Sequence, residues 1–234
     1  APKPNILFIA IDDLRPELGC YGAPAVKSPN LDKLAGEGRL FDRAYCQYPI
    51  CGPSRASLLT GLRPSTLKID EIDTFFRNTV PDCVTLPQHF KQHGYKTLYI
   101  GKVFHPRQED DENSWDRRIP LPGKGAYDAG EYKLPESKEI VKRRRAEALA
   151  KYGPESLKEG LGNGPAWEAA DVSDSEYLDG RVADGAIAEL RKVKQDGKPF
   201  FLGVGFHKPH LPFVAPKKYF DLYDPARLPL TDIR

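Results

Sequence analysis

A run of apolar residues near the start of the chain, NILFIAI at positions 5–11, constrains the fold more than any other feature of the sequence. Several of its residues favour β-strands, and a strand that is apolar along both faces is typical of a parallel sheet. The run ends abruptly at Asp12 and Asp13. We therefore expect a strand buried on both faces, followed directly by two carboxylates.

The rest of the chain alternates between strand-like and helix-like segments. Further strands are expected at residues 40–46, 96–100 and 199–206. Helices are expected at residues 29–38, 53–59, 86–93, 138–151 and 180–193. Residues 106–137 are rich in Pro, Gly, Asp and Glu and are expected to form a long irregular excursion. The alternation predicts an α/β fold with a mostly parallel sheet flanked by helices on both faces.

The composition excludes several classes of protein. The chain of 234 residues is long enough for one large α/β domain, and its net charge of +2 argues against a nucleic-acid-binding surface. No apolar run approaches the roughly 20 residues that a membrane-spanning helix needs. The chain starts with Ala-Pro-Lys-Pro rather than a targeting segment, so we expect a mature chain from which any such segment has been removed.

The cysteines form no recognisable framework. There are four, Cys20, Cys46, Cys51 and Cys83, and their spacing matches no zinc or Cys-x-x-Cys pattern. If Cys51 takes part in chemistry, the other three are either buried thiols or one disulfide and one free thiol. The sequence leaves both alternatives open.

Residues that can carry chemistry follow directly after three of the expected strands. They are Asp12 with Asp13, residues 102–105, and residues 207–210. In open α/β sheets, ligands bind outside the carboxyl ends of the strands, so we expect these residues to share one site. Two adjacent carboxylates repel each other, and a divalent cation such as Ca²⁺ or Mg²⁺ relieves that repulsion. The alternative for Asp12 and Asp13 is a helix N-cap in a solvated turn.

The sequence CGPSR at positions 51–55, followed by LTG at 59–61, predicts an anion site at the start of a helix. Pro53 suits the first turn of a helix, which places Cys51 where the helix dipole stabilises negative charge and lowers the pKa of a thiol. Arg55 lies about one turn further on and can reach the same anion. The alternative is a buried cysteine ahead of an ordinary helix.

The order Cys-x-Pro-Ser-Arg and then Leu-Thr-Gly resembles the signature of the type I sulfatases, formylglycine-dependent enzymes of the alkaline-phosphatase superfamily. The acidic pair Asp12-Asp13, GKVFHP at 101–106 and FHKPHLPF at 206–213 are similar to the iduronate-2-sulfatase branch of this family. The resemblance runs through most of residues 4–106 and again through about 180–225. It implies an alkaline-phosphatase/sulfatase-like fold.

The resemblance implies a role for each matched residue around the sulfate. Cys51 is expected to be oxidised to formylglycine and to serve as the catalytic nucleophile. Asp12, Asp13 and residue 51 are expected to bind Ca²⁺, with Mg²⁺ as an alternative. The positive charges of Arg55 and Lys102 are expected to stabilise the charge that spreads over the sulfate oxygens in the transition state.

The histidines are expected to move protons. His105 would transfer a proton at the hydrated aldehyde of the formylglycine, and His210 would protonate the leaving oxygen of the sugar. The match of His207 and Lys208 to the family is less specific. These two residues either bind the substrate or cap the end of the strand.

The activity implied is hydrolysis of a sulfate ester on a sugar, with the 2-O-sulfate of a uronic acid in a glycosaminoglycan or related polysaccharide as substrate. A calcium site takes about 6–8 oxygen ligands, more than these residues supply. Sulfatases bring further ligands and a lysine from a later segment, and none follows His210. We therefore expect an N-terminal portion that needs a C-terminal segment or a second chain, in a periplasmic, secreted or lysosomal location with the bacterial periplasm favoured.

Three alternatives remain open. A phosphonate or phosphate-ester hydrolase of the same superfamily can use the same aldehyde. A non-catalytic remnant could bind sulfated glycans without a second half. An ordinary cysteine enzyme is the third, although no Ser/His/Asp-like arrangement around Cys51 is apparent in the sequence.

Overall fold

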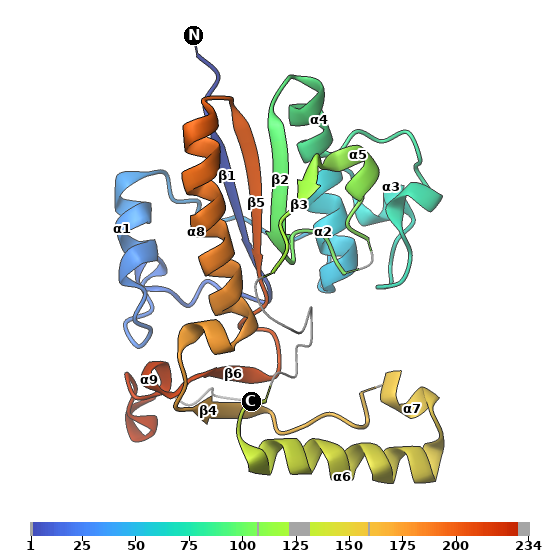
Figure 1. Cartoon of the computed structure of the whole chain (residues 1–234), viewed down its shortest axis with the longest axis vertical. Helices are drawn as coiled ribbons and strands as arrows, with labels where there is room; N and C mark the ends of the chain where they lie inside the picture. Colours follow the sequence, from blue (N-terminus) through green and yellow to red (C-terminus); the bar gives the residue numbers. More distant parts are fainter. Residues whose placement is uncertain (1, 107, 122–131, 159, 229–234) are drawn as a thin grey trace.

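The chain folds around a four-stranded parallel sheet, as shown by a computed structural model that describes residues 2–106, 108–121, 132–158 and 160–228. The strand order is β1 (Ile6–Ile11), β5 (Phe200–Phe206), β2 (Lys96–Gly101) and β3 (Arg117–Arg118). Each neighbouring pair is parallel. Because β5 lies between β1 and β2, segments far apart in the sequence end side by side at one edge of the sheet (Figure 1).

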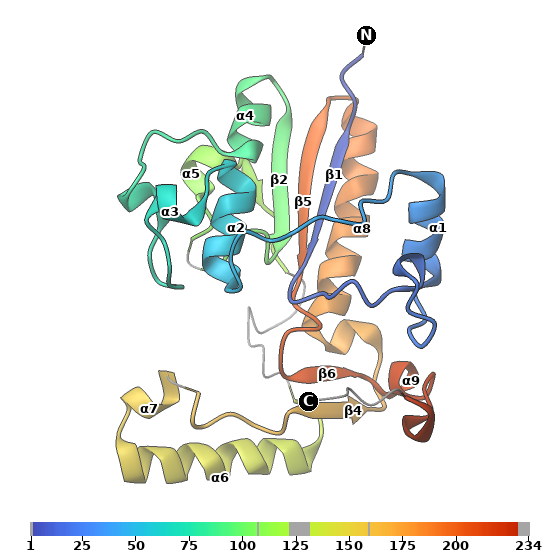
Figure 2. The same ribbon diagram turned by 180° about the vertical axis from the view of Figure 1, so that it is seen from behind.

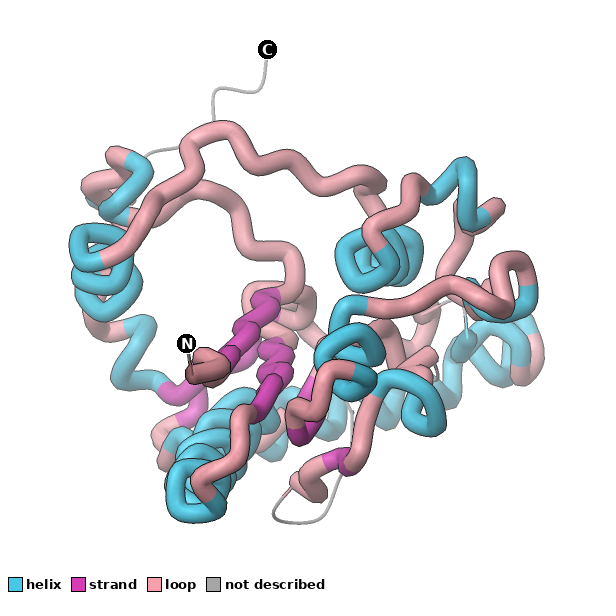
Figure 3. The backbone as a smooth tube through the Cα atoms, turned by 90° about the horizontal axis from the view of Figure 1, so that it is seen from above, coloured by secondary structure: helices cyan, strands magenta, loops and turns pink. Residues whose placement is uncertain are grey.

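Helices cover both faces of this sheet, which confirms the predicted α/β class. On one face, α2 (Cys51–Thr60) and α4 (Leu86–Gln92) form a core with β2 and β5 that includes Leu59, Phe90, Tyr99 and Phe201. On the other face, α8 (Leu178–Asp196) packs through Val182 and Ala186 on Leu98, Ile100 and Leu202. Successive side chains of a strand point to opposite faces, so β2 serves both cores. Figure 2 shows the sheet and the helices on its two faces from behind, and Figure 3 shows them from above.

Strand β1 differs from the expectation of a strand buried on both faces. Leu7 is 46% exposed and Ile9 is 48% exposed, and no residue of β1 is fully buried. In the part of the chain that the structure describes, β1 pairs only with β5 and is therefore an edge strand. Helix α8 packs mainly on β5 and β2, so the face of β1 that carries Leu7 and Ile9 stays partly open to solvent. The most deeply buried strand is β5, whose first six residues are all buried.

A second, smaller sheet lies at the carboxyl edge of the first (Figure 1). It consists of the parallel strands β4 (Trp167–Ala170) and β6 (Phe213–Pro216), which sequence patterns did not predict. The remaining helices are α1 (Pro29–Glu37), α3 (Pro64–Leu67), α5 (Asp111–Ser114), α6 (Pro135–Tyr152), α7 (Glu155–Lys158) and α9 (Lys217–Phe220). Short 3₁₀ helices span Gly19–Tyr21, Phe76–Asn78, Asp174–Glu176 and Pro225–Arg227.

Two further expectations need correction. The strand expected at residues 40–46 does not form. Among the described residues no strand pairs with this segment, and Phe41 and Tyr45 are 66% and 79% exposed. The excursion expected at 106–137 contains α5 and β3, while residues 107 and 122–131 lie outside the described residues. Strand β3 is held by backbone hydrogen bonds from Asp116 N to Thr97 O at 2.9 Å and from Ile119 N to Tyr99 O at 2.8 Å.

Candidate active site

Three buried charged side chains meet at the carboxyl edge of the main sheet. Asp12 follows β1, Lys102 follows β2, and Arg55 comes from the second turn of α2. The Arg55 guanidinium donates to Asp12 Oδ1 at 2.9 Å, and the Lys102 ammonium donates to Asp12 Oδ2 at 2.5 Å. The exposed fractions are 4% for Asp12, 5% for Lys102 and 6% for Arg55. The predicted convergence of Asp12, Arg55 and Lys102 is therefore present.

The guanidinium of Arg55 also fixes the end of β2. Its Nη1 donates to the backbone carbonyl of Lys102 and to that of Val103, the latter at 2.9 Å. Arg55 can make these contacts because α2 begins at Cys51 and turns the side chain of Arg55 towards the sheet edge. A planar guanidinium with several donors suits a site where a carboxylate and two carbonyls converge.

The charges around Asp12 decide its ionisation. Burial alone would raise the pKa of the Asp12 carboxyl, but the attraction of Arg55 and the hydrogen bond and charge of Lys102 outweigh it and hold the pKa below its usual value. Asp12 is therefore ionised, and two buried cations face one buried carboxylate. This excess of positive charge is the electrostatic condition for binding an anion.

Two glycines allow β2 and β5 to approach closely beside Lys102. Gly101 has φ of +74°, in the left-handed region that glycine tolerates best. A Cβ on Gly205 would lie 1.9 Å from the backbone oxygen of Lys102, so no side chain fits there. Lys102 N donates to Gly205 O at 2.9 Å across this contact. The glycine pair thus sets where the Lys102 side chain begins.

Cys51 is the first residue of α2 and lies close to both carboxylates. A pocket of about 320 Å³ is lined by Cys51 together with Asp12, Asp13, Ser54 and Arg55, among others. Cys51 therefore lines the same pocket as the acidic pair, at the start of the helix, where the dipole favours negative charge. All four cysteines are free in the structure, and Cys46 is exposed, so neither open alternative, three buried thiols or one disulfide, describes the other three.

His105 and His207 are neutral near neutral pH. Burial, followed by the positive charge of Lys102, lowers the pKa of His105 to about 4. The same two causes lower the pKa of His207 to about 3. Both imidazoles therefore keep an unprotonated ring nitrogen at neutral pH, while burial and the charge of Lys102 make them weaker bases than an exposed histidine.

His210 occupies the rim of the site. Its Nε2 lies 4.0 Å from Asp13 Oδ2, and both side chains are partly exposed. Its Nδ1 lies 2.6 Å from the backbone oxygen of Leu211, which leaves Nε2 as the nitrogen that faces the acidic pair. His210 is thus placed beside Asp13, while His105 and His207 lie deeper.

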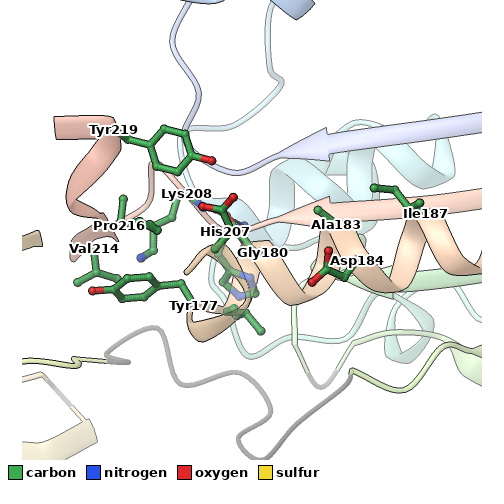
Figure 4. A pocket seen from close by; sticks show the side chains of 14 residues that line it. Tyr177, Gly180, Ala183, Asp184, Ile187, His207, Lys208, Val214, Pro216 and Tyr219 are labelled. Carbon is green, nitrogen blue, oxygen red and sulfur yellow. Dashed lines mark hydrogen bonds between the residues drawn. The ribbon is translucent and has the colours of Figure 1, made fainter. Parts of the chain in front are cut away.

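The side chain of Lys208 binds two backbone carbonyls of its own loop. Its ammonium donates to His210 O at 2.9 Å and to Pro212 O at 2.6 Å. This arrangement supports the alternative in which Lys208 holds the strand end. His207 and Lys208 also line a neighbouring pocket of about 450 Å³, with Tyr177 and Tyr219 among its walls (Figure 4).

Sequence reasoning missed Asp179. This residue lies in the first turn of α8, and its carboxylate accepts backbone hydrogen bonds from His207 and Lys208. The available signal was an acidic residue directly before the helix expected at 180–193, but the sequence did not indicate which distant amides it would bind.

The three residues expected from the sequence to bind a divalent cation lie together. Asp12, Asp13 and residue 51 line one pocket, and carboxylate oxygens suit Ca²⁺ or Mg²⁺. Among the residues that the structure describes, no group of three or more His, Cys, Asp or Glu side chains comes together as a complete metal site. Both oxygens of Asp12 instead face Arg55 and Lys102. The acidic pair fits such a cation but needs ligands beyond these residues.

The fold and the buried charges define an α/β protein with Arg55 and Lys102 buried around Asp12 at the carboxyl edge of its sheet. A family model described as "Sulfatase" matches residues 4–227, and the chain belongs to the sulfatase family. It is 38% identical over 224 residues to a human protein named iduronate 2-sulfatase, covering 94% of this chain and 37% of that one. The chain thus spans less than half the length of this relative.

Solved structures support the fold. The structure of Ps i-CgsB in complex with k-i-k-neocarrahexaose matches with a TM-score of 0.67 at 22% identity, over 97% of this chain and 50% of that one. A phosphonate monoester hydrolase from Agrobacterium radiobacter matches with a TM-score of 0.60 at 26% identity, over 97% of this chain and 45% of that one. In the described part of the chain, no helix is both long and apolar enough to span a membrane.

Proposed function

We propose that this chain supplies the nucleophile and the sulfate-binding charges of an enzyme that hydrolyses a sulfate ester on a sugar. The observation that carries this proposal is the convergence of Arg55 and Lys102 on Asp12, beside the pocket of Cys51. A sulfate ester is an anion, and buried cations that are already in place stabilise the charge on its oxygens without reorganisation.

The nucleophile of this proposal is residue 51. When Cys51 has been oxidised to formylglycine after translation, hydration of its aldehyde gives two hydroxyls. One of them attacks sulfur and gives up its proton to water as the new S–O bond forms. His210 protonates the sugar oxygen as its bond to sulfur breaks, so that the sugar leaves as an alcohol. His105, which is neutral, removes the proton from the second hydroxyl, so that sulfate leaves with the first oxygen and the aldehyde forms again.

The divalent cation belongs to the same proposal. Asp12, Asp13 and residue 51 would hold it, and it would add positive charge beside the sulfate oxygens. The chain spans 37% of its human relative, and the described residues offer only part of a coordination shell. We therefore place the remaining ligands on a further segment or a second chain.

The substrate class follows from the relative rather than from the geometry. Identity of 38% to a protein named iduronate 2-sulfatase supports the 2-O-sulfate of a uronic acid in a glycosaminoglycan. Hydrolysis of phosphonate or phosphate esters is the second candidate, supported by the similarity to a phosphonate monoester hydrolase.

Three measurements on the complete enzyme test the proposal. Mass spectrometry of the peptide spanning residues 44–63 should show loss of sulfur and gain of oxygen at position 51. Parallel assays on a 2-O-sulfated uronate oligosaccharide, a 6-O-sulfated one and a phosphonate monoester should show fastest release of the 2-O-sulfate. Cys51→Ala should abolish turnover and leave the unfolding midpoint unchanged. An unmodified thiol in active protein, or a large preference for the phosphonate, would overturn the assignment.

A further inference from the structure

The side chain of Asp179 joins α8 to the loop that carries His210. Its Oδ1 accepts from His207 N at 2.9 Å, and its Oδ2 accepts from Lys208 N at 2.8 Å and from His207 N at 3.1 Å. These two amides are the first backbone donors after β5 ends at Phe206. Asp179 therefore provides acceptors at the point where the sheet no longer does.

The residue just before the loop, Phe206, is hydrogen-bonded to Asp12, which follows β1. Asp12 N donates to Phe206 O at 3.1 Å, and the next two amides of the chain bind Asp179. The start of the loop is thus fixed between the strand that leads to the acidic pair and the first turn of α8. Any shift of the Asp179 carboxylate moves this start relative to Asp12.

Internal hydrogen bonds carry this constraint to His210. His210 N donates to His207 O at 2.9 Å, and the Lys208 ammonium donates to His210 O at 2.9 Å. These bonds tie His210 to the start of the loop. Its far end places His210 Nε2 at 4.0 Å from Asp13 Oδ2.

A carboxylate is the group that this position needs. It offers two acceptor oxygens to two amide donors, whereas an asparagine would turn one NH₂ group towards an N–H. Burial raises the pKa of the Asp179 carboxyl, and the hydrogen bonds from His207 and Lys208 oppose that rise. The carboxylate is thus kept in a partly buried position by the two amides that it binds.

We propose that Asp179 is a positioning residue for His210: it fixes the loop so that His210 meets the leaving oxygen of the substrate. This inference rests on the proposed function, in which His210 protonates that oxygen. Asp179 is not among the residues that line the pocket of Cys51, and it contacts the loop through the backbone amides of His207 and Lys208.

The test compares two sulfate esters in the complete enzyme. A sugar sulfate has an alcohol leaving group that needs protonation, whereas 4-nitrophenyl sulfate has a leaving group that does not. Asp179→Asn should lower kcat on the sugar sulfate by about 10- to 100-fold, since a small misplacement of a catalytic group can cost that much. On 4-nitrophenyl sulfate the loss should stay below about threefold, because general-acid help is not needed there.

Asp184→Asn is the matched control. Asp184 lies on the same helix, is exposed, and lines the same pocket as Asp179. Its carboxylate accepts a surface hydrogen bond from Ser175 at 2.6 Å and none of the loop amides. It should leave both rates within about twofold, as exposed sites usually do. Asp179→Ser, which is smaller and keeps one acceptor, serves as the second variant if Asp179→Asn unfolds.

His210→Ala distinguishes the proposed role of His210 from the proposed role of Asp179. It should show the same selective loss, and in the double variant with Asp179→Asn the two losses should not add. If His210→Ala slows both esters equally, the proposed role of His210 fails. If His210→Ala is selective while Asp179→Asn slows both esters equally or adds fully, the role of Asp179 is overturned. It is also overturned if neither Asp179 variant folds, because the residue then serves stability.

Discussion

The ammonium of Lys102 lies 2.5 Å from the carboxylate of Asp12, although 90 positions separate the two residues in the sequence. They meet because β1 and β2 both pair in parallel with β5 and end at the same edge. With Arg55 on the other oxygen of Asp12, the site holds two buried cations and one buried anion. One carboxylate therefore faces two buried cations, and the backbone at the ends of β2 and β5 holds all three residues in place.

Lys102→Met should remove activity without unfolding the protein. The methionine fills a similar volume, and Asp12 keeps Arg55 as its partner, so the buried pair stays neutral. We expect a loss of about 100-fold or more in kcat/KM, because the proposed function needs the positive charge of Lys102 to stabilise the sulfate oxygens in the transition state. Lys96→Met is the control, since Lys96 lies at the opposite end of β2 and pairs with Asp196 near the surface. Equal losses in the two variants would contradict this assignment.

Asp12→Asn should destabilise the protein far more than Asp13→Asn. The first change leaves Arg55 and Lys102 buried without a counter-charge, which costs about 3–5 kcal/mol in comparable buried pairs. The Asp13 side chain is 56% exposed, so its change should cost less than about 0.5 kcal/mol. Urea unfolding of both variants measures the difference, and similar midpoints would show that the buried charges do not depend on Asp12.

Stability should fall as the pH is lowered from about 6.5 towards 3 because of His207. The pKa of His207 is about 3 in the folded protein, against an unfolded value of 6.5, so the unfolded chain binds the extra proton first. Stability therefore rises with pH through this window. Between pH 7 and pH 5 the loss from this residue is on the order of 2 kcal/mol.

His207→Gln tests the source of that pH dependence. The variant should lose less stability between pH 7 and pH 5 than the parent, as measured by the denaturant midpoint at each pH. His93→Gln, at an exposed position, is the matched control and should retain the parent's slope. If both variants kept the same slope, the acid sensitivity would have another origin.

Gly205→Ala should disturb the site through the backbone. The new Cβ would lie 1.9 Å from the backbone oxygen of Lys102, which cannot move without separating β2 from β5. We expect a destabilisation of about 3 kcal/mol, the upper part of the range for overpacking. Gly203→Ala on the same strand meets only side chains, the nearest atom being at 3.0 Å, and should cost about 1 kcal/mol. Thermal unfolding of the two variants decides this, and equal midpoints would show that the close contact is not strained.

Local patterns predicted the parts of the site that depend on short stretches of chain. The helix that starts at Cys51 follows from the proline in its first turn, and β2 and β5 follow from their apolar runs. The placement of Asp12 and Lys102 after strands predicted their meeting, because parallel strands share a carboxyl edge. The family resemblance added the roles of these residues, which no spacing shows.

Features that depend on a neighbouring strand could not be predicted from local sequence patterns. The segment at 40–46 has strand-like residues but no neighbouring strand, so it remains irregular. The run at 6–11 forms a strand, yet Leu7 and Ile9 are half-exposed because β1 lies at the edge of the described sheet. Strands β4 and β6 are four residues each and carry too short a pattern to be found alone.

By itself, the sequence determined where strands and helices alternate, and which charged residues come at strand ends, because these depend on residues close together in the chain. Only the tertiary structure decided that β5 lies between β1 and β2, that two cations share one carboxylate, and that Asp179 binds amides 28 and 29 residues away. Hydrogen-bond partners and burial are set by packing between distant segments, and a local pattern carries no record of which segment will be the neighbour.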